Sequence, residues 1–251
     1  MDTTAVILGG GYAGVMAANR LAASGRSGLK VVLVTPGPRF VERIRLHEYT
    51  AGTRADATVD YGSVLHPGVH LVRDAAAGIL PDMRTVRLAA GGDLAYDYLV
   101  YAVGSAAAAA PGGALRIEHL EGAAGARREL SALPAGGRVA VVGGGFTAVE
   151  TAAETAGAFP HLSVALHSAS DVARTLGIPA RRALVKRLGK AGVQLHTGSP
   201  VATDGDVRRN LTADVVLWCA GFAVPQLAAN AGLAVDGSGR LCLEPALQAQ
   251  G

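Results

Sequence analysis

The sequence has few aromatic residues, little net charge and no long hydrophobic run. Aromatic residues make up 4% of the 251 residues and apolar residues 50%, so the core must be built from Ala, Val and Leu. A net charge of only +3 argues against a nucleic acid or an anionic membrane as partner. No uncharged apolar stretch reaches the ~20 residues that a transmembrane helix needs, and no signal peptide follows Met1. The expected location is the cytoplasm.

Cysteine is also scarce, since the chain holds only Cys219 and Cys242. They form no Cys-x-x-Cys pair and have no metal-ligand spacing, which argues against a redox-active dithiol and predicts no metal site. Cys219 lies in the apolar run DVVLWCAGF, where we expect a buried structural thiol.

Glycine is abundant, and a first cluster follows the apolar run Ala5–Leu8, which predicts a buried parallel strand. The cluster reads Gly-x-Gly-x-x-Gly, in which the first glycine allows a tight turn, the second lets a pyrophosphate approach, and the third lets the following helix pack on the strand. Backbone N–H groups at the start of that helix would face two phosphates. The candidate residues are Gly9, Gly10, Gly11, Tyr12, Ala13 and Gly14.

The same pattern returns in VAVVGGGFTAVETAAE, with a strand expected at 138–142 and a helix at 149–157. Alanine takes the place of the third glycine, a variant that the motif accepts. Two copies, each with a strand before it and a helix after it, predict two dinucleotide sites. The candidate residues of the second loop are Gly143, Gly144, Gly145, Phe146, Thr147 and Ala148.

The strand after each loop lacks the acidic end residue that usually binds the adenosine ribose. The strand 30–34 ends in Thr35-Pro36, and the strand 163–166 is followed by His167-Ser168. Without that carboxylate a 2′-phosphate is not repelled, whereas Asp171 nearby argues for NADH. The choice between NADH and NADPH stays open.

The remaining segments complete an α/β pattern that restarts at residue 138. The amphipathic stretch 40–52 follows Arg39 and carries Arg43, Arg45 and His47. This pattern predicts a solvated helix face, with a flavin or phosphate contact as the alternative. The helix expected at 179–191 has a basic face, which predicts a solvated face, with a role in phosphate binding as the alternative. Its cations are Arg181, Arg182, Lys186, Arg187 and Lys190. Further strands are expected at 69–72 and 85–88 (in a hairpin or meander), 98–103, 193–196 and 214–218, a short helix at 125–133, an interdomain connection at 106–113, and a hairpin at 236–239.

With these residues placed, the sequence resembles the pyridine nucleotide-disulphide oxidoreductase superfamily. Within it, the resemblance is closest to type II NADH dehydrogenases and apoptosis-inducing-factor-like flavoproteins, which lack the disulphide. The segments that carry it are VILGGGYAG, YDYLVYAVGS, VVGGGFTAVETAAE and ADVVLWCAGF, in this order over the whole chain.

The resemblance implies two Rossmann-like three-layer dinucleotide-binding domains, with the NAD(P)H domain inserted in the FAD domain. Residues 1–110 would begin the FAD domain, residues 111–222 would form the NAD(P)H domain, and residues 223–251 would return to the FAD domain and leave it incomplete. The implied activity is an FAD-dependent NAD(P)H oxidoreductase that passes hydride to FAD and then electrons to an acceptor such as a quinone.

The resemblance also assigns roles to the candidate residues. The first loop would hold the FAD diphosphate and the second the NAD(P)H diphosphate. Glu150 would orient the nicotinamide carboxamide, or it is simply an exposed first-turn carboxylate favoured by the helix dipole. No residue stands out as an acid, base or nucleophile, as direct hydride transfer requires none. The other implied cofactor contacts are Thr35, Pro36, Arg43, Ala102, Val103, Gly104, His167, Ser168, Ala220, Gly221 and Phe222.

Family members usually continue into Gly-Asp-x-Ala and a C-terminal domain, which the sequence lacks after GRLCLEPALQAQG. One alternative is therefore a nucleotide-binding or regulatory protein without turnover, and the sequence leaves open a second copy or another chain that completes the fold. Another is a non-flavin enzyme that uses only one loop, which the absence of a Tyr-x-x-x-Lys pair disfavours. The expected partners are NAD(P)H and an unidentified electron acceptor.

Overall fold

The computed structural model describes residues 2–106 and 108–250, and their contacts divide them into two compact units. Unit 1 comprises residues 2–41, 58–106 and 223–250, and unit 2 comprises residues 42–57 and 108–222. Residue 107, inside the expected connection 106–113, lies outside the described residues. Each unit is built on a parallel sheet, so the expected α/β class is confirmed.

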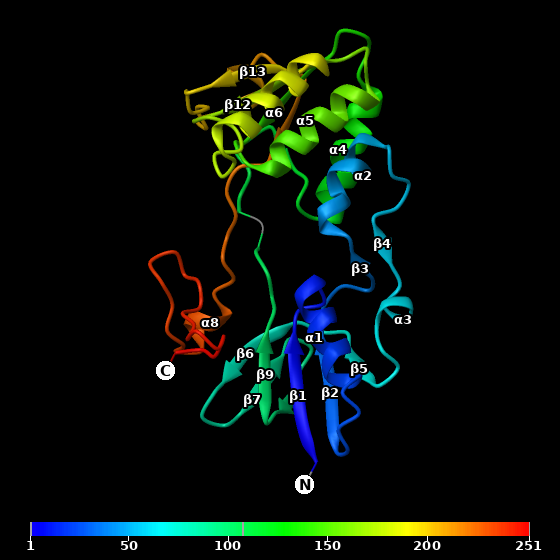
Figure 1. Cartoon of the computed structure of the whole chain (residues 1–251), viewed down its shortest axis with the longest axis vertical. Helices are drawn as coiled ribbons and strands as arrows, with labels where there is room; N and C mark the ends of the chain where they lie inside the picture. The colour runs from blue at the N-terminus through cyan, green and yellow to red at the C-terminus, as the bar shows by residue number, and fades with distance from the viewer. Residues whose placement is uncertain (1, 107, 251) are drawn as a thin grey trace. The chain divides into compact units, whose positions relative to one another are not determined.

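Unit 1 is built on a four-stranded parallel sheet in the order β5-β2-β1-β9. The central strand β1 has no polar alternation and is buried from Ala5 to Leu8, as expected for a strand covered on both faces. Figure 1 shows α1 lying along this sheet. The elements are β1 (Thr3–Leu8), α1 (Tyr12–Ala22), β2 (Leu29–Val34), β5 (Val69–Val72) and β9 (Tyr98–Tyr101).

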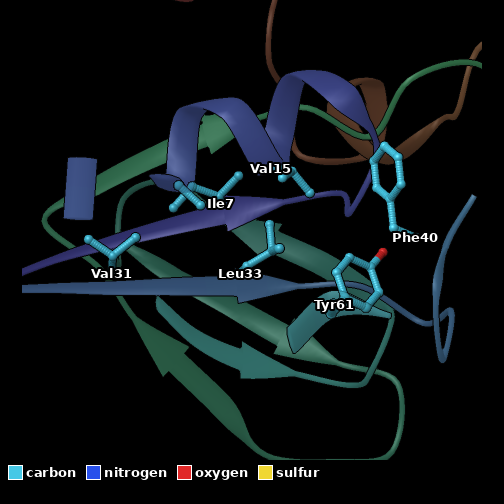
Figure 2. Packing of buried hydrophobic residues seen from close by; sticks show 7 residues of the cluster. Ile7, Val15, Val31, Leu33, Phe40 and Tyr61 are labelled. Carbon is cyan, nitrogen blue, oxygen red and sulfur yellow. The ribbon is translucent and has the colours of Figure 1, made fainter. Parts of the chain in front are cut away.

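The two faces of this sheet form separate apolar cores. On one face, Ile7 and Leu33 pack under Val15 of α1, and Figure 2 shows Phe40 and Tyr61 at the end of the same cluster. On the other face, Leu8 and Val34 pack with Ile79 and Val86. The buried residues of the second cluster are all aliphatic, as the composition predicts, whereas the first also contains the rings of Phe40 and Tyr61.

The second layer of unit 1 is an antiparallel sheet of β6 (Ala76–Leu80), β7 (Thr85–Leu88) and β8 (Asp93–Ala95). The expected hairpin or meander containing 69–72 is wrong for that strand, because β5 pairs with β2 in the parallel sheet. Smaller elements are β3 (Phe40–Val41), β4 (Thr58–Val59), α3 (Tyr61–Val64) and α8 (Leu227–Asn230). The hairpin signal at 236–239 is confirmed, since Val235 and Leu241 form an antiparallel bridge.

Unit 2 is built on a five-stranded parallel sheet in the order β10-β14-β11-β12-β13. Its face that carries Ala140 and Val142 packs on Val207 of the short helix α7. Unit 1 crosses from its third strand to β9 through the antiparallel sheet, whereas unit 2 crosses from β13 to β14 through α7. The elements are β10 (Ala114–Arg116), α4 (Leu120–Ala132), β11 (Arg138–Val142), α5 (Phe146–Ala158), β12 (Ser163–Ser168), α6 (Ile178–Lys190), β13 (Gln194–Thr197), α7 (Val207–Asn210) and β14 (Val215–Trp218).

The segment 42–57 packs with unit 2, although it lies inside the range 1–110 that the sequence groups with the first domain. The single helix expected at 40–52 is wrong, because the chain forms β3, then a 3-10 turn (Arg43–Arg45), then α2 (Leu46–Ala51). Leu46 is buried in the packing of α2 on α4 and α5. Arg127 of α4 lies over the Tyr49 ring and donates to the carbonyl of Arg54, which ties the segment to unit 2.

Candidate functional site

The first glycine loop joins β1 to α1, and its glycines differ in the space around them. Gly9 has a φ of 108°, and a Cβ atom on it would lie 2.2 Å from the Ala102 carbonyl oxygen. A Cβ atom on Gly14 would lie 1.8 Å from the Gly9 carbonyl oxygen. A Cβ atom on Gly11, in contrast, would meet nothing within 4 Å. Gly9 and Gly14 therefore serve packing, while Gly11 leaves open space for a ligand.

The second loop joins β11 to α5 with the same division of roles. A Cβ atom on Gly143 would lie 3.1 Å from the Cys219 carbonyl carbon, and one on Gly145 would meet nothing within 4 Å. The third position is Ala148, which is fully buried. The helix of unit 2 thus accommodates a methyl group where that of unit 1 leaves room only for hydrogen.

Both helices begin without a side-chain cap. Gly11 is the N-cap of α1 and Gly145 that of α5, and neither first turn contains an acidic residue. The first backbone N–H groups of a helix have no partner inside it, and they carry the positive end of its dipole. Tyr12, Ala13, Phe146 and Thr147 therefore lie at helix ends that fit an anionic group such as a diphosphate.

A hydroxyl side chain at the end of the second strand lies beneath each loop: Thr35 directly follows β2, and Ser168 is the last residue of β12. A Cβ atom on Gly10 would lie 2.6 Å from Thr35 Oγ1, and one on Gly144 would lie 2.5 Å from Ser168 Oγ. Thr35 is 5% exposed and Ser168 2%, so both hydroxyls support the glycine backbone from below. Pro36 is exposed beside Thr35.

Tyr61 supports the first loop, a role that no local pattern in the sequence indicates. Its hydroxyl donates to the Gly10 carbonyl oxygen at 2.9 Å and lies 3.4 Å from Thr35 Oγ1. The ring is buried and packs edge-on with Phe40, which in turn packs edge-on with Tyr12. The local signal around Tyr61 is the helix cap of Asp60, which locates α3 and says nothing of the loop.

His167 turns its side chain to the opposite face of the sheet from Ser168. Its ring stacks on that of His196, with centroids 4.6 Å apart, and both line a cavity of about 580 Å³. Burial, and then the nearby His196, lower the pKa of His167 from its ordinary value. The backbone of His167 still contacts the loop, because its carbonyl accepts from the Gly143 N–H at 2.9 Å.

The residues after the returning strands β9 and β14 flank the two loops. Ala102 and Val103 contact Gly9, and Gly104 follows them. Cys219 contacts Gly143, and burial raises the pKa of its thiol to about 12, which agrees with an inert structural cysteine.

Arg116 is a second supporting residue that the sequence did not reveal. Its side chain is 7% exposed, and Nη2 donates to the carbonyl oxygens of Ala220 at 3.2 Å and Gly221 at 2.6 Å. Its Nε donates to Glu118. Two of the three expected contact residues after β14 are thus held through their carbonyls, and the third, Phe222, is exposed.

Arg43 and Glu150 lie together in unit 2, around a cavity of about 510 Å³ next to Thr147. Arg43 Nε donates to the Glu118 carbonyl oxygen at 3.1 Å. Glu150 is exposed in the second turn of α5, so the reading of it as a first-turn carboxylate is wrong. The structure brings Arg43 beside the second loop's helix, with which the sequence had not connected it.

The described residues contain neither a group of three or more metal-ligating side chains nor a helix with the length and hydropathy needed to cross a bilayer. The cytoplasmic location stays a prediction.

Comparisons with known proteins agree with the two-loop architecture. Residues 3–250 match the model of the family described as pyridine nucleotide-disulphide oxidoreductase. A NADH dehydrogenase-like protein of Mycobacterium tuberculosis is 32% identical, over 99% of this chain and 70% of the relative.

Solved structures show the same fold. A NAD-dependent persulfide reductase from A. fulgidus superposes with a TM-score of 0.80 at 21% identity, over 99% of this chain and 52% of that one. The sulfide:quinone oxidoreductase of Aquifex aeolicus superposes with a TM-score of 0.75 at 21% identity, over 92% of this chain and 61% of that one. The chain thus spans less than two thirds of the length of these two structures.

Proposed function

Because the chain belongs to the pyridine nucleotide-disulphide oxidoreductase family, we propose that it is the nucleotide-binding part of an FAD-dependent NAD(P)H oxidoreductase. The observation that carries the proposal is the pair of glycine loops, each with open space at its middle motif glycine and an uncapped helix behind it. When bound, FAD would supply the capacity to accept hydride from the nicotinamide and to release electrons to an acceptor.

In this proposal the first loop holds the FAD diphosphate. The open side of Gly11 would admit the phosphates, and the N–H groups of Tyr12 and Ala13 would donate to them. Tyr61 and Thr35 fix the loop from below, which keeps these donors oriented before the ligand arrives. Pro36 would border the adenosine, and Ala102, Val103 and Gly104 would approach the cofactor through their backbone.

The second loop holds the NAD(P)H diphosphate by the same means, with Gly145 in the place of Gly11. Glu150, at the edge of the cavity beside Thr147, would orient the nicotinamide carboxamide. Arg43 faces the same cavity and would add positive charge near the nucleotide. These residues bind and orient the nucleotide, and no proton transfer to a side chain is needed.

A quinone is the proposed electron acceptor. Support comes from the named activity of the Aquifex aeolicus structure and from the NADH dehydrogenase-like relative.

A matched pair of variants tests the proposal. Gly11→Val and Gly145→Val each place a branched side chain in open space, so neither should clash with the fold. We expect Gly11→Val to lose visible flavin absorbance after reconstitution with FAD. Gly145→Val should keep the absorbance but lose its bleaching by NADH or NADPH under anaerobic conditions.

The outcomes separate the alternatives. Normal FAD retention in Gly11→Val would refute the assignment of the first loop. Parent protein that binds NAD(P)H but stays colourless with FAD would favour a nucleotide-binding protein without turnover. Far-UV circular dichroism of both variants, unchanged from the parent, is the control for folding.

A further inference from the structure

The end of β12 carries no carboxylate that could bind a ribose 2′-hydroxyl. An acidic residue in this place recognises the NAD ribose, and a nearby arginine accommodates the 2′-phosphate of NADP. Ser168 lies buried under Gly144, and the His167 ring stacks on His196 at the other face of the sheet. Neither residue can therefore take the role of the acid.

Asp171 is the one acidic residue between 167 and 177, and its charge is already paired. Its Oδ2 atom lies 3.2 Å from Nη1 of Arg181 in α6. A carboxylate paired in this way repels a phosphate less than an unpaired one, since the guanidinium balances its charge. The ion pair therefore weakens the argument that Asp171 favours NADH.

The loop that carries Asp171 is fixed onto the second glycine loop. Ala173 is buried with a φ of 48°, which is unusual for a residue other than glycine, and its N–H donates to the Gly144 carbonyl oxygen at 2.7 Å. The Leu176 N–H donates to the Ala173 carbonyl at 2.9 Å. Arg174 follows Ala173 directly, so the same hydrogen bond to Gly144 holds its backbone close to the expected diphosphate position. Its side chain is exposed.

The neighbouring surface is strongly basic. Arg181, Arg182 and Lys186 of α6 line a cavity of about 430 Å³ with Asp171 and Thr197, the last residue of β13. The cavity therefore has three cationic side chains against one carboxylate. Arg174 does not line the cavity, but it is an exposed cation three residues after Asp171 on the same loop.

From this arrangement we propose that unit 2 selects NADPH over NADH, with Arg174 and Arg182 binding the 2′-phosphate of its adenosine ribose. The inference rests on the proposed function of the second loop as the pyridine-nucleotide site. Arg181 has a different role, because its pairing with Asp171 offsets part of the repulsion between that carboxylate and a phosphate. Guanidinium groups suit this ligand, since they donate charge-assisted hydrogen bonds to phosphate oxygens.

Binding of two nucleotide fragments to the full chain tests the inference without any need for turnover. The probes are 2′,5′-ADP and 5′-AMP, which differ in the 2′-phosphate alone, and the dissociation constants come from calorimetry. We expect 2′,5′-ADP to bind at least about tenfold more tightly, as one charge-assisted contact to phosphate provides. Because the contact is ionic, the advantage should shrink as salt is raised.

Variants assign the contact. Arg174→Ser and Arg182→Ser should each weaken 2′,5′-ADP binding by about tenfold and leave 5′-AMP unchanged. The control is Lys190→Ser, since Lys190 is an exposed cation of the same helix that does not line the cavity. It should change neither dissociation constant. A general effect of net charge would lower the affinity equally in all three variants and would overturn the assignment.

The two proposals fail in different ways. Equal affinity for both fragments in the parent chain would overturn NADPH selection and leave the second loop as a nucleotide site. Absence of binding of both fragments would overturn the inference together with the proposed function of that loop.

Discussion

Unit 1 and unit 2 place a glycine loop at the same point of a parallel sheet but support it with different side chains. In each, the loop follows a strand that lies between the second strand and the returning strand, which is where such sheets bind ligands. Beneath the first loop lie Thr35 and the Tyr61 hydroxyl, whereas beneath the second lies Ser168. The two units thus share the backbone geometry of the loop but differ in the side chains that pack beneath it.

The difference separates the glycine whose surroundings are open from the positions that pack against the strand. Gly11 and Gly145 have open space in both units, which a ligand needs and packing does not. The third position is free to vary, because its residue faces the strand rather than the ligand. The spacing between helix and strand then decides whether glycine or alanine fits there.

The largest expected effect on stability comes from exchanging glycine and alanine at the third motif position, which is Gly14 in unit 1 and Ala148 in unit 2. Gly14→Ala would place a methyl group 1.8 Å from the Gly9 carbonyl oxygen, so we expect unit 1 to lose about 3 kcal/mol or more of stability. Hydrogen exchange of the β1 amides should reveal the loss. The matched change Ala148→Gly should cost unit 2 only about 1 kcal/mol, from helix propensity. Similar costs in both units would contradict the difference in spacing.

The next effect concerns how each unit holds the chain after its returning strand. Unit 1 uses a backbone bridge between Ala106 and Ala223, whereas unit 2 uses the buried Arg116. Arg116→Met would leave the Ala220 and Gly221 carbonyls without this donor, at a cost of about 2 to 3 kcal/mol.

Urea unfolding followed by the fluorescence of Trp218, the chain's single tryptophan, reports on unit 2. The control is Arg138→Met, since Arg138 pairs with Asp214 at the surface and should contribute less than about 1 kcal/mol. Equal midpoints for the two variants would refute the supporting role of Arg116.

A smaller effect is expected from the hydroxyl under the first loop. Tyr61→Phe removes the hydrogen bond to the Gly10 carbonyl and should cost unit 1 about 1 kcal/mol. It should also weaken FAD binding, because the loop donors lose part of their fixed orientation. Titration of the variant with FAD, followed by flavin fluorescence, checks this. Ser168→Ala is the corresponding change in unit 2 and should leave FAD binding as it was.

The smallest effect is a pH dependence confined to unit 2. The register position of Val34 and Val72 in unit 1 is taken by His167 and His196 in unit 2. Since the pKa of His167 is lowered by folding, the unfolded state binds its proton first as pH falls through about 6.5. The Trp218 unfolding midpoint should therefore decrease as pH falls from 7 towards 5.5. His167→Leu should reduce this dependence, and an unchanged slope would exclude His167 as its source.

Most of the sheet strands and both loops could be predicted from the sequence, because apolar runs and glycine spacing are local signals. The strands at 30–34, 138–142 and 214–218 match β2, β11 and β14 to within a residue. The family was identified from four such segments, and the comparisons confirm it. The main segment whose structure and packing could not be predicted from the sequence is 42–57. Its partners lie on α4 and α5, more than 60 residues further along the chain.

The sequence by itself determined where the two glycine turns join a strand to a helix, because a Gly-x-Gly-x-x-Gly turn needs only neighbouring residues. Only the tertiary structure decided which side chains support those turns and which charged groups lie near them. Tyr61 reaches Gly10 of the first loop from 51 residues away, and Arg116 reaches Gly221, after β14, from 105 residues away. Arg181 of α6 forms an ion pair with Asp171 of the preceding loop. Such contacts depend on how the elements pack, and no local pattern encodes them.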